Sequence, residues 1–312
     1  MSYSTDTYIA NDGERIFSYK WKSASKKPKG IVQIAHGIGE HAGRYQHIAE
    51  LLQEQGYEVY ANDHRIHGKS TESKDLLGLY DGNNFFDDAV EDMRELSKII
   101  KSEHPSEKII LFGHSMGSFL SRDYVTKYGD DIKLLILSGT ASFIKGLGFI
   151  GLTSANVIKF FKGKKNPNSI LKSMFFTEFN KKFKPNRTLV DWISRDEEQV
   201  DMYCADPYRI EDFSTSVYID LIKGNKKVNE KNAFKATPKS LPIYIFSGDK
   251  DPVGEMGKGV QKVANQYVES GISDLTLKLY RNGRHEMLSE INKTEVEQDL
   301  LNWLNERVEA KN

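Results

Sequence analysis

The sequence predicts an α/β fold with a mainly parallel β-sheet, and three patterns support this prediction. Short apolar runs bounded by Gly, Asp or Ser are typical of buried parallel strands. They fall at Gly30–Ala35, Glu58–Ala61, Lys108–Phe112, Lys133–Leu137, Pro242–Phe246 and Leu275–Leu279. Amphipathic stretches between the runs predict helices over Arg44–Gln55, Phe86–Ser102, Gly257–Glu269 and Glu290–Val308. Strands that alternate with helices indicate an α/β fold.

Two segments depart from this alternation. Thr5–Ala10 and Arg15–Lys22 have the period of strands, and the turn signal Asn11-Asp12-Gly13 between them predicts a hairpin. From about Thr140 the parallel-strand runs stop, and they resume at Leu241. We therefore expect residues 140–236 to form an inserted helical cap, and residues 1–139 and 237–312 to form the core.

Composition limits the possible functions. A chain of 312 residues can bury a large core without disulfides or metal ions. Basic and acidic residues number 44 each, so no overall field favours nucleic acid. The single cysteine, Cys204, excludes an intramolecular disulfide. There is no signal-peptide pattern, and no uncharged apolar stretch reaches the roughly 20 residues that span a bilayer. These observations favour a cytoplasmic protein, at most peripheral to a membrane.

Ser115 is the candidate nucleophile. It is the centre of Gly113-His114-Ser115-Met116-Gly117, a G-x-S-x-G motif between a predicted strand and a helix-compatible stretch. This context is typical of a nucleophile elbow, a strained turn that projects the serine hydroxyl into a cleft. We expect the backbone N–H of Met116, at the helix start, to stabilise a developing oxyanion. The His114 side chain is expected to point away.

His285 is the candidate base that a serine hydroxyl needs. It lies in the loop after the last predicted strand, from which it can reach over the sheet edge to Ser115. A carboxylate must orient this base, and both Asp249 and Asp251 follow the strand Pro242–Phe246. Asp251 is favoured because it stands in a G-x-x-D arrangement, with Asp249 as the alternative. The chain order Ser, Asp, His is one of the known orders of catalytic triads.

A second oxyanion donor is predicted in the loop after Gly30–Ala35. Glycines on either side let the backbone approach a substrate oxygen, and the N–H of Ile38 is the candidate donor. His36 and His41 could suggest a metal pair, but no residue nearby completes a ligand set, so we expect no metal. The predicted chemistry requires no cofactor.

Five stretches together resemble the monoacylglycerol lipase and lysophospholipase branch of the α/β-hydrolases, also grouped as serine aminopeptidase S33-like hydrolases. They are HGIGEHAGRY (36–45), NDHRIHGKS (62–70), GHSMGS (113–118), SGDKDPVG (247–254) and NGRHEMLSE (282–290). The resemblance implies an eight-stranded α/β-hydrolase sheet with an inserted cap. It also implies the roles given above to Ser115, His285, Ile38 and Met116, and it selects Asp251 over Asp249.

One position departs from the family pattern. Ile66 stands where the family usually has glycine in the stretch D-x-R-G-H-G-x-S. A β-branched residue disfavours positive φ, so we expect this loop to be shaped differently. We assign no catalytic role to Arg65 or His67.

The first half of the expected cap is basic and aromatic. Residues 141–190 contain ten Lys or Arg and one acidic residue, Glu178. The same stretch contains Phe143, Phe149, Phe160, Phe161, Phe175, Phe176, Phe179 and Phe183. Such a segment can dock on an anionic membrane or line an acyl tunnel. Alternatively the lysines are solvated and the phenylalanines pack on the core. No nucleic-acid-binding motif accompanies the charge.

The sequence thus predicts a serine carboxylic ester hydrolase that acts on a monoacyl lipid, a monoacylglycerol or lysophospholipid, through an acyl-enzyme. One alternative is an aminopeptidase or amidase, resembling proline iminopeptidases, with the same triad. It would need a carboxylate in the cap to hold a substrate ammonium group, and the candidates are Glu197, Glu198, Asp201 and Asp206. The other alternative is a non-catalytic binding protein of the same fold.

Overall fold

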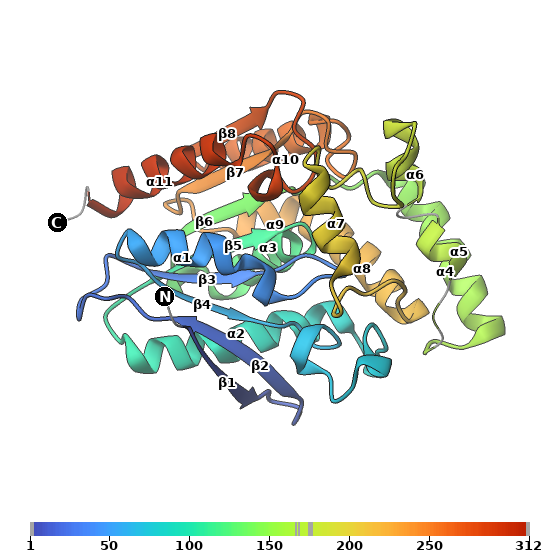
Figure 1. Ribbon diagram of the computed structural model, residues 1–312, viewed down its shortest axis with the longest axis horizontal. Helices are drawn as coiled ribbons and strands as arrows, with labels where there is room; N and C mark the ends of the chain where they lie inside the picture. Colours follow the sequence, from blue (N-terminus) through green and yellow to red (C-terminus); the bar gives the residue numbers. More distant parts are fainter. Residues whose placement is uncertain (1–2, 166, 168, 174–176, 310–312) are drawn as a thin grey trace.

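A computed structural model describes residues 3–165, 167, 169–173 and 177–309. Within these residues, eight strands form one sheet in the order β1-β2-β4-β3-β5-β6-β7-β8 (Figure 1). The strands are β1 (Ser4–Ile9), β2 (Arg15–Trp21), β3 (Ile31–Ala35), β4 (Glu58–Asn62), β5 (Ile109–His114), β6 (Ile132–Ser138), β7 (Ile243–Gly248) and β8 (Leu275–Tyr280). β2 runs antiparallel to β1 and β4, and the other neighbours pair in parallel. The predicted mainly parallel sheet is confirmed.

The N-terminal hairpin forms as predicted. β1 and β2 pair from Ser4 opposite Lys20 to Ile9 opposite Arg15. Gly13 in the turn has a φ of 90°, which glycine adopts at little cost. β2 then pairs with β4, which joins the hairpin to the parallel part of the sheet.

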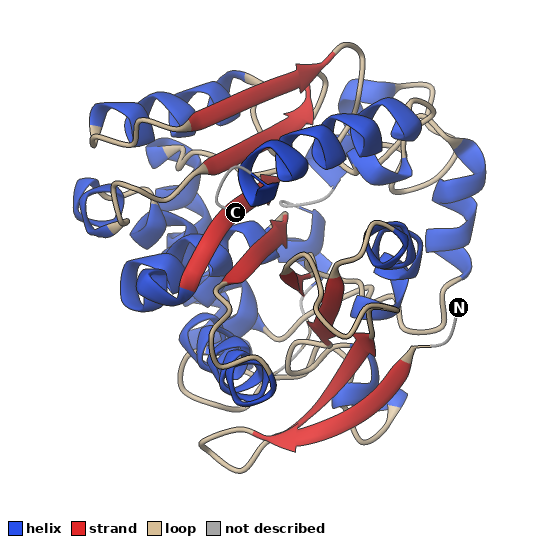
Figure 2. Ribbon diagram, turned by 90° about the vertical axis from the view of Figure 1, so that its left-hand side faces the viewer, coloured by secondary structure: helices blue, strands red, loops and turns tan. Residues whose placement is uncertain are grey.

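Helices cover both faces of the sheet. On one face, α1 (Gln46–Glu54) and α11 (Lys293–Glu309) share a buried core with the strands. On the other face, α2 (Phe85–Glu103), α3 (Met116–Tyr128) and α10 (Lys258–Glu269) do the same. Figure 2 shows the twisted sheet between these two layers. Because both faces are covered, β3 and β5 are buried at every residue, which explains their continuous apolar runs.

The four predicted helices form, with shifts at their ends. α1 begins at Gln46 because Ala42–Tyr45 form a 3-10 turn before it. α11 begins at Lys293 and not at the predicted Glu290. The carboxylate of Glu290 is buried and accepts the backbone N–H groups of Arg195 and Arg284. The residue therefore holds a loop in place and does not open the helix.

The segment between β6 and β7 is helical, as expected. It contains α4 (Lys145–Lys162), α5 (Ser169–Lys172), α6 (Glu178–Asn180), α7 (Glu197–Ala205), α8 (Thr215–Val228) and α9 (Lys231–Ala236). α8 packs against α2 and α3, and α9 packs against α3 and α10, so these two helices continue the core layer. Figure 1 shows α4, α5 and α6 on the far side of α7 and α8 from the sheet. None of the described helices has the length and hydropathy needed to cross a membrane.

The expectation that Ile66 would keep its loop out of a positive-φ conformation is wrong. Ile66 has a φ of 64°, a conformation that costs a residue with a Cβ roughly 1–2 kcal/mol. Its side chain is buried in the core, and its carbonyl accepts the N–H of Gly78 at 2.9 Å. The preceding Arg65 forms a two-pronged buried ion pair with Asp92. These contacts hold the strained residue in place.

Candidate active site

Ser115 lies at a sharp turn between β5 and α3, as the motif predicts. Its φ of 52° and ψ of −117° are strained for a residue with a side chain. A Cβ on Gly113 would lie 2.3 Å from the carbonyl oxygen of Gly117, and one on Gly117 would lie 2.0 Å from that of Ala35. The two glycines are therefore needed for close backbone contact, and the strand–turn–helix context is confirmed.

Hydrogen bonds on both sides hold this turn. The N–H of Ser115 donates to the carbonyl of Ser138 at 2.9 Å, and its carbonyl accepts the hydroxyl of Ser118 at 2.6 Å. Met116 begins α3, and its side chain is buried in the core. The first N–H groups of a helix have no acceptor within the helix, so the Met116 N–H is available at this end.

His285 and Asp251 are brought together from two loops. His285 Nδ1 lies 3.0 Å from Asp251 Oδ1, and both side chains are buried. Asp251 also accepts the hydroxyl of Ser247 at 2.7 Å and the N–H of Val253 at 2.9 Å. The other candidate carboxylate, Asp249, instead accepts the N–H of Asn282 at 2.8 Å.

The electrostatics of this pair are those of a base with its counter-ion. Burial lowers the pKa of His285, but the charge and hydrogen bond of Asp251 outweigh burial and leave that pKa above its usual value. Burial likewise raises the pKa of Asp251, but His285 outweighs it and the pKa of Asp251 is lowered. Asp251 is therefore ionised, and it favours the imidazolium form of its partner.

The loop after β3, residues 36–41, which we call the β3 loop, leaves the N–H of Ile38 free while the N–H groups on either side of it are bonded. The N–H of Gly37 donates to Glu40 Oε1 at 2.7 Å, and that of Gly39 donates to His67 Nε2 at 3.3 Å. The N–H of Ile38, between them, has no acceptor among the described residues. Ile38 lines the same pocket as Ser115 and His285.

Buried neutral imidazoles support the β3 loop from below. His36 Nδ1 lies 2.7 Å from the carbonyl oxygen of Gly37, and His36 Nε2 accepts the N–H of His64 at 2.9 Å. Burial lowers the pKa of His36 well below its usual value, that of His64 to about 3 and that of His67 to about 4. Near neutral pH all three rings are therefore uncharged and can accept a hydrogen bond at one nitrogen.

A pocket with two walls opens at Ser115. It encloses about 770 Å³ of space, including its open mouth. The core side carries polar groups and comprises Ile38, Glu40, His114, Ser115, His285 and Glu286. The side formed by the segment between β6 and α8 is mixed. Its apolar side chains are Leu189, Val190, Trp192, Ile193, Ile210 and Phe213, and its polar ones are Lys172, Thr177, Tyr203, Arg209 and Glu211.

The expectation that His114 points away is wrong. Its ring lies 4.9 Å from that of His285, and it lines the pocket. Its Nδ1 lies 3.0 Å from the hydroxyl of Ser138, and burial lowers the pKa of His114 to about 3. The elbow turns the residue before Ser115 toward the base, which a five-residue pattern does not indicate.

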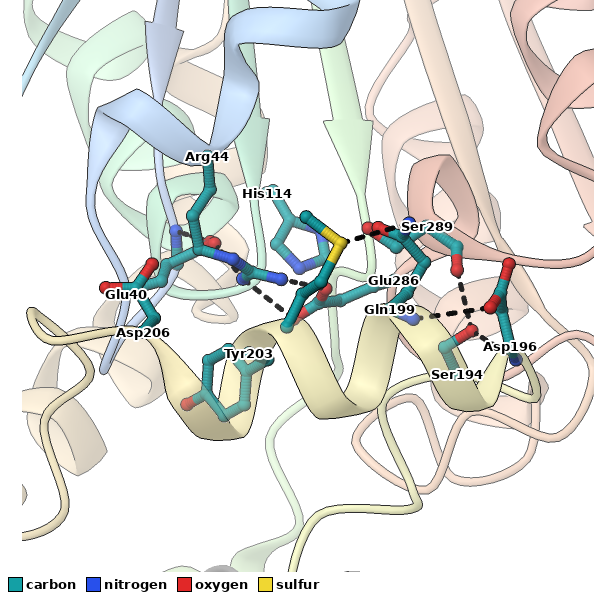
Figure 3. A network of polar contacts seen from close by, with 12 residues as sticks. Glu40, Arg44, His114, Ser194, Asp196, Gln199, Tyr203, Asp206, Glu286 and Ser289 are labelled. Atoms are coloured by element: carbon teal, nitrogen blue, oxygen red, sulfur yellow. Dashed lines mark hydrogen bonds and ion pairs between the residues drawn. The ribbon is translucent and has the colours of Figure 1, made fainter.

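Sequence reasoning also missed a polar network of Glu40, Arg44 and Glu286. Arg44 lies between the two carboxylates and stacks on Tyr203 of α7, with the guanidinium carbon 4.7 Å from the ring centre (Figure 3). A signal was present, because Glu40 and Arg44 belong to HGIGEHAGRY and Glu286 follows the predicted base. Nothing in the sequence indicated that the two stretches meet.

Residues 190–210, including α7, are hydrogen-bonded to the β3 loop and to the loop after β8 that carries His285. At one end, the carbonyl of Ile193 accepts the N–H of Glu286 at 2.7 Å, and the hydroxyl of Ser194 donates to the carbonyl of Ser289 at 2.7 Å (Figure 3). At the other end, the N–H of Ile210 donates to the carbonyl of Gly39 at 3.1 Å. The Trp192 ring lies 5.1 Å from that of His285.

The four carboxylates named as candidates for holding a substrate ammonium group do not line the pocket. Asp206 Oδ2 is 3.0 Å from His41 Nε2, and Asp201 accepts a hydrogen bond from Arg187 at 2.6 Å. Glu197 lies 3.7 Å from the same arginine. Neither these three residues nor Glu198 is among the described residues that line the pocket.

One group of potential metal ligands lies at the end of the sheet where the parallel strands begin. Among the described residues, Glu58, Glu103 and His104 have ligand atoms within 4.8 Å of one another. Lys20 pairs with both glutamates, which already compensates their charge. Since Glu58 begins β4 and the pocket lies at the ends of the parallel strands, this group is remote from Ser115.

Comparison with known proteins places these observations in a family. The family model described as "Serine aminopeptidase, S33" matches residues 26–292. The chain is 30% identical to a monoacylglycerol lipase of Mycolicibacterium smegmatis over 96% of both chains. It is 26% identical to the monoglyceride lipase of Mus musculus over 99% of this chain and 93% of the mouse protein.

Solved structures agree with the sequence comparison. A thermostable carboxyl esterase from Bacillus coagulans, crystallised in complex with glycerol, superposes with a TM-score of 0.91 at 27% identity over 99% of both chains. The chain therefore belongs to the serine aminopeptidase S33 family, in the monoacylglycerol lipase branch of the α/β-hydrolases, and is a serine hydrolase of the carboxylic ester hydrolase type.

Proposed function

We propose that this protein hydrolyses the ester bond of monoacyl lipids through Ser115, His285 and Asp251. Ser115 attacks the ester carbonyl while His285 accepts the hydroxyl proton and Asp251 stabilises the resulting imidazolium. The N–H groups of Ile38 and Met116 hold the oxyanion. His285 then returns the proton to the leaving alcohol. Water, activated by the same histidine, cleaves the acyl-enzyme and releases the fatty acid.

The observation that carries this proposal is the buried contact of 3.0 Å between His285 and Asp251, at the pocket that Ser115 lines. The raised pKa of His285 makes it a stronger base, and the lowered pKa of Asp251 keeps the counter-ion of the imidazolium ionised. The unpaired N–H of Ile38 supplies a donor where an oxyanion would develop.

The two walls of the pocket support a monoacyl lipid as substrate. The apolar side chains of one wall, such as Leu189, Ile193 and Phe213, suit an acyl chain, because burial of each CH₂ contributes about 0.8 kcal/mol. The polar wall, with Glu40 and Glu286, suits a hydroxylated head group. The relatives named above are themselves a monoacylglycerol lipase and a monoglyceride lipase.

A substrate panel tests the proposal. Monoacylglycerols, lysophospholipids, short-chain esters and aminoacyl amides are compared, with Ser115→Ala as the blank. We expect turnover of monoacyl esters, and covalent labelling of Ser115 by a fluorophosphonate probe. Hydrolysis of aminoacyl amides but not of fatty esters would support an aminopeptidase. Absence of both labelling and turnover would support a binding protein.

We further propose that the segment between β6 and α7 acts as a lid that meets a lipid surface. α4 exposes Ile150, Val157 and Phe160, and the surrounding segment is rich in lysine. An exposed apolar face next to basic residues suits the surface of an anionic bilayer. Of the other phenylalanines in the expected cap, Phe175 and Phe176 lie outside the described residues.

Vesicle co-sedimentation tests the lipid-surface proposal. We expect more protein to bind vesicles that contain an anionic lipid than vesicles of neutral phosphatidylcholine, and added salt should reduce the difference. Equal and negligible binding to both would remove membrane contact from the proposal without affecting the chemistry at Ser115.

A further inference from the structure

Arg44 holds a buried position between two carboxylates. Its Nη1 donates to Glu40 Oε2 at 2.5 Å, and its Nη2 donates to Glu286 Oε2 at 2.9 Å. A longer contact of 3.3 Å joins Nη1 to the other oxygen of Glu286. One guanidinium thus serves two glutamates that are 246 positions apart in the sequence (286 − 40).

Both carboxyl groups act as hydrogen-bond acceptors. Glu40 accepts the N–H of Gly37 at 2.7 Å and the hydroxyl of Tyr45 at 2.8 Å on one oxygen, and the Arg44 hydrogen bond on the other. Burial raises the pKa of Glu40 above its usual value, and Arg44, the Tyr45 hydroxyl and the Gly37 N–H act in the opposite direction. Burial raises the pKa of Glu286, but Arg44 outweighs burial and leaves that pKa below its usual value.

The two glutamates belong to the two loops that carry the proposed reacting groups. Glu40 holds the N–H of Gly37, one residue before the free donor Ile38 in the β3 loop. Glu286 is bonded to His285 through the chain, in the loop after β8, residues 281–290, which we call the β8 loop. A shift of either loop would change the distance between the oxyanion donor and the base.

We infer that Arg44 is a positioning residue, which fixes the β3 loop relative to the β8 loop through Glu40 and Glu286. This inference rests on the proposed function of Ser115 and His285. Arg44 is not among the described residues that line the pocket, so it acts from behind the two glutamates. The planar guanidinium suits this task because its donors lie in a fixed fork, whereas an ammonium group has no such geometry.

The group of Arg44, Glu40 and Glu286, which we call the clamp, also contributes charge at His285. The titratable and charged groups around this histidine are Asp251, His114, Glu40, Arg44 and Glu286. Asp251 has the largest effect among those that raise the pKa of His285, and Glu286 and Glu40 act in the same direction. Removing the charge of Glu286 should therefore make the imidazolium less stable, whereas exchanging Arg44 for lysine leaves the net charge unchanged.

Two substitutions separate position from charge. Arg44→Lys keeps the charge and loses the fork, and we expect kcat to fall roughly 10- to 100-fold with little change in KM, since small misplacements of reacting groups have effects of this size. Its acid limb in the profile of kcat/KM against pH should stay in place. Glu286→Gln should lower kcat and also move that limb to lower pH, because the neutral side chain favours neutral His285.

A matched control is Asp131→Asn, which removes the carboxylate of another arginine pair. Arg94 Nη1 lies 2.5 Å from Asp131 Oδ2, at α2 and the turn before β6. We expect this variant to keep the kcat and the acid limb of the unchanged protein. Thermal melting of all variants shows whether they fold, and Arg44→Lys tests the inference even if Glu286→Gln does not fold.

The outcomes distinguish the clamp from the proposed function. If Arg44→Lys folds and keeps kcat within about twofold, the inference is overturned, whatever Glu286→Gln does. If the unchanged protein is labelled at Ser115 and turns over esters, the proposed function stands in that case. If the unchanged protein is not labelled and does not turn over esters, the proposed function fails first.

Discussion

Two consecutive parts of the segment that follows β6, which we call the outer half and the anchored half, are built differently. The outer half, residues 141–189, packs on α8 through α4 and exposes large apolar side chains such as Phe160. The anchored half, residues 190–210, is hydrogen-bonded to the β3 loop at Gly39 and to the β8 loop at Glu286 and Ser289. The anchored half thus belongs to the architecture of the site, and the outer half is available for contact with substrate and surface.

The charges follow the same division. In the outer half nearly all charged residues are basic, and lysines such as Lys181 form ion pairs with largely exposed carboxylates. In the anchored half, acidic side chains are paired with basic ones, as with Asp206 and His41. Loss of paired buried groups affects stability far more than loss of solvated ones. Substitutions in the two halves should therefore have different effects.

The largest effect on turnover should come from a substitution in the core, at Ser115, which belongs to neither half. Ser115→Ala removes the proposed nucleophile and should lower kcat by about 10⁴-fold or more, because the triad residues act as a unit. Steady-state turnover of a monoacylglycerol measures this effect. The variant should keep the melting temperature of the unchanged protein. Turnover near the original rate would contradict the assignment of Ser115.

Acid should destabilise the fold through the buried histidines beside the β3 loop. The pKa of His64 is lowered to about 3 and that of His67 to about 4, and that of His36 is lowered too, so the folded chain binds fewer protons than the unfolded chain below about pH 6.5. Stability should therefore fall as pH decreases, by about 1.4 kcal/mol per pH unit for each buried histidine.

Urea unfolding at a series of pH values checks this slope. His67→Gln keeps an acceptor for the N–H of Gly39 and should reduce the slope between pH 6 and pH 4.5. An unchanged slope in this variant would show that other groups set the acid limit of the fold.

Breaking an ion pair of the anchored half should lower the free energy of unfolding by less than acidification does, but by a measurable amount. Glu290 is fully buried and accepts hydrogen bonds from the side chain of Arg195 at 2.8 Å and from the N–H of Arg284 at 2.8 Å. Glu290→Gln should destabilise the protein by on the order of 3 kcal/mol, because a buried ion pair loses one partner. The midpoint of urea unfolding measures the change, with Asp131→Asn as the control for a partly exposed pair.

The smallest effect on stability should come from the outer half. Phe160 is 84% exposed, so Phe160→Ser should change the free energy of unfolding by less than about 0.5 kcal/mol. Turnover of a short soluble ester should be unchanged, and binding to anionic vesicles should fall. A large loss of stability in this variant would erase the proposed difference between the halves.

Much of the fold could be predicted from the sequence, because buried parallel strands leave continuous apolar runs. Six strands follow from such runs, β1 and β2 follow from their alternation and turn signal, and four helices follow from their amphipathic period. Ser115, Asp251 and His285 could be selected because each follows a recognisable strand. Their catalytic roles stay a prediction, and so do the boundaries of the cap, where α8 and α9 pack with the core helices.

The rest could not be predicted because it depends on contacts distant in sequence. Arg44 and Glu286 are 242 positions apart in the sequence, and they meet only when the β3 and β8 loops come together. The direction of His114 follows from the backbone turn at Ser115. The positive φ of Ile66 is maintained by burial and by neighbouring hydrogen bonds, which override the local preference of isoleucine.

The free N–H of Ile38 has a consequence for observing this protein at work. Its neighbours in the β3 loop are held by Glu40 and His67, so their amide hydrogens should exchange slowly with deuterated solvent. The Ile38 amide hydrogen should exchange faster in the free protein and become protected once an oxyanion-like inhibitor occupies the pocket. A single backbone amide would then report occupancy of the site without any added label.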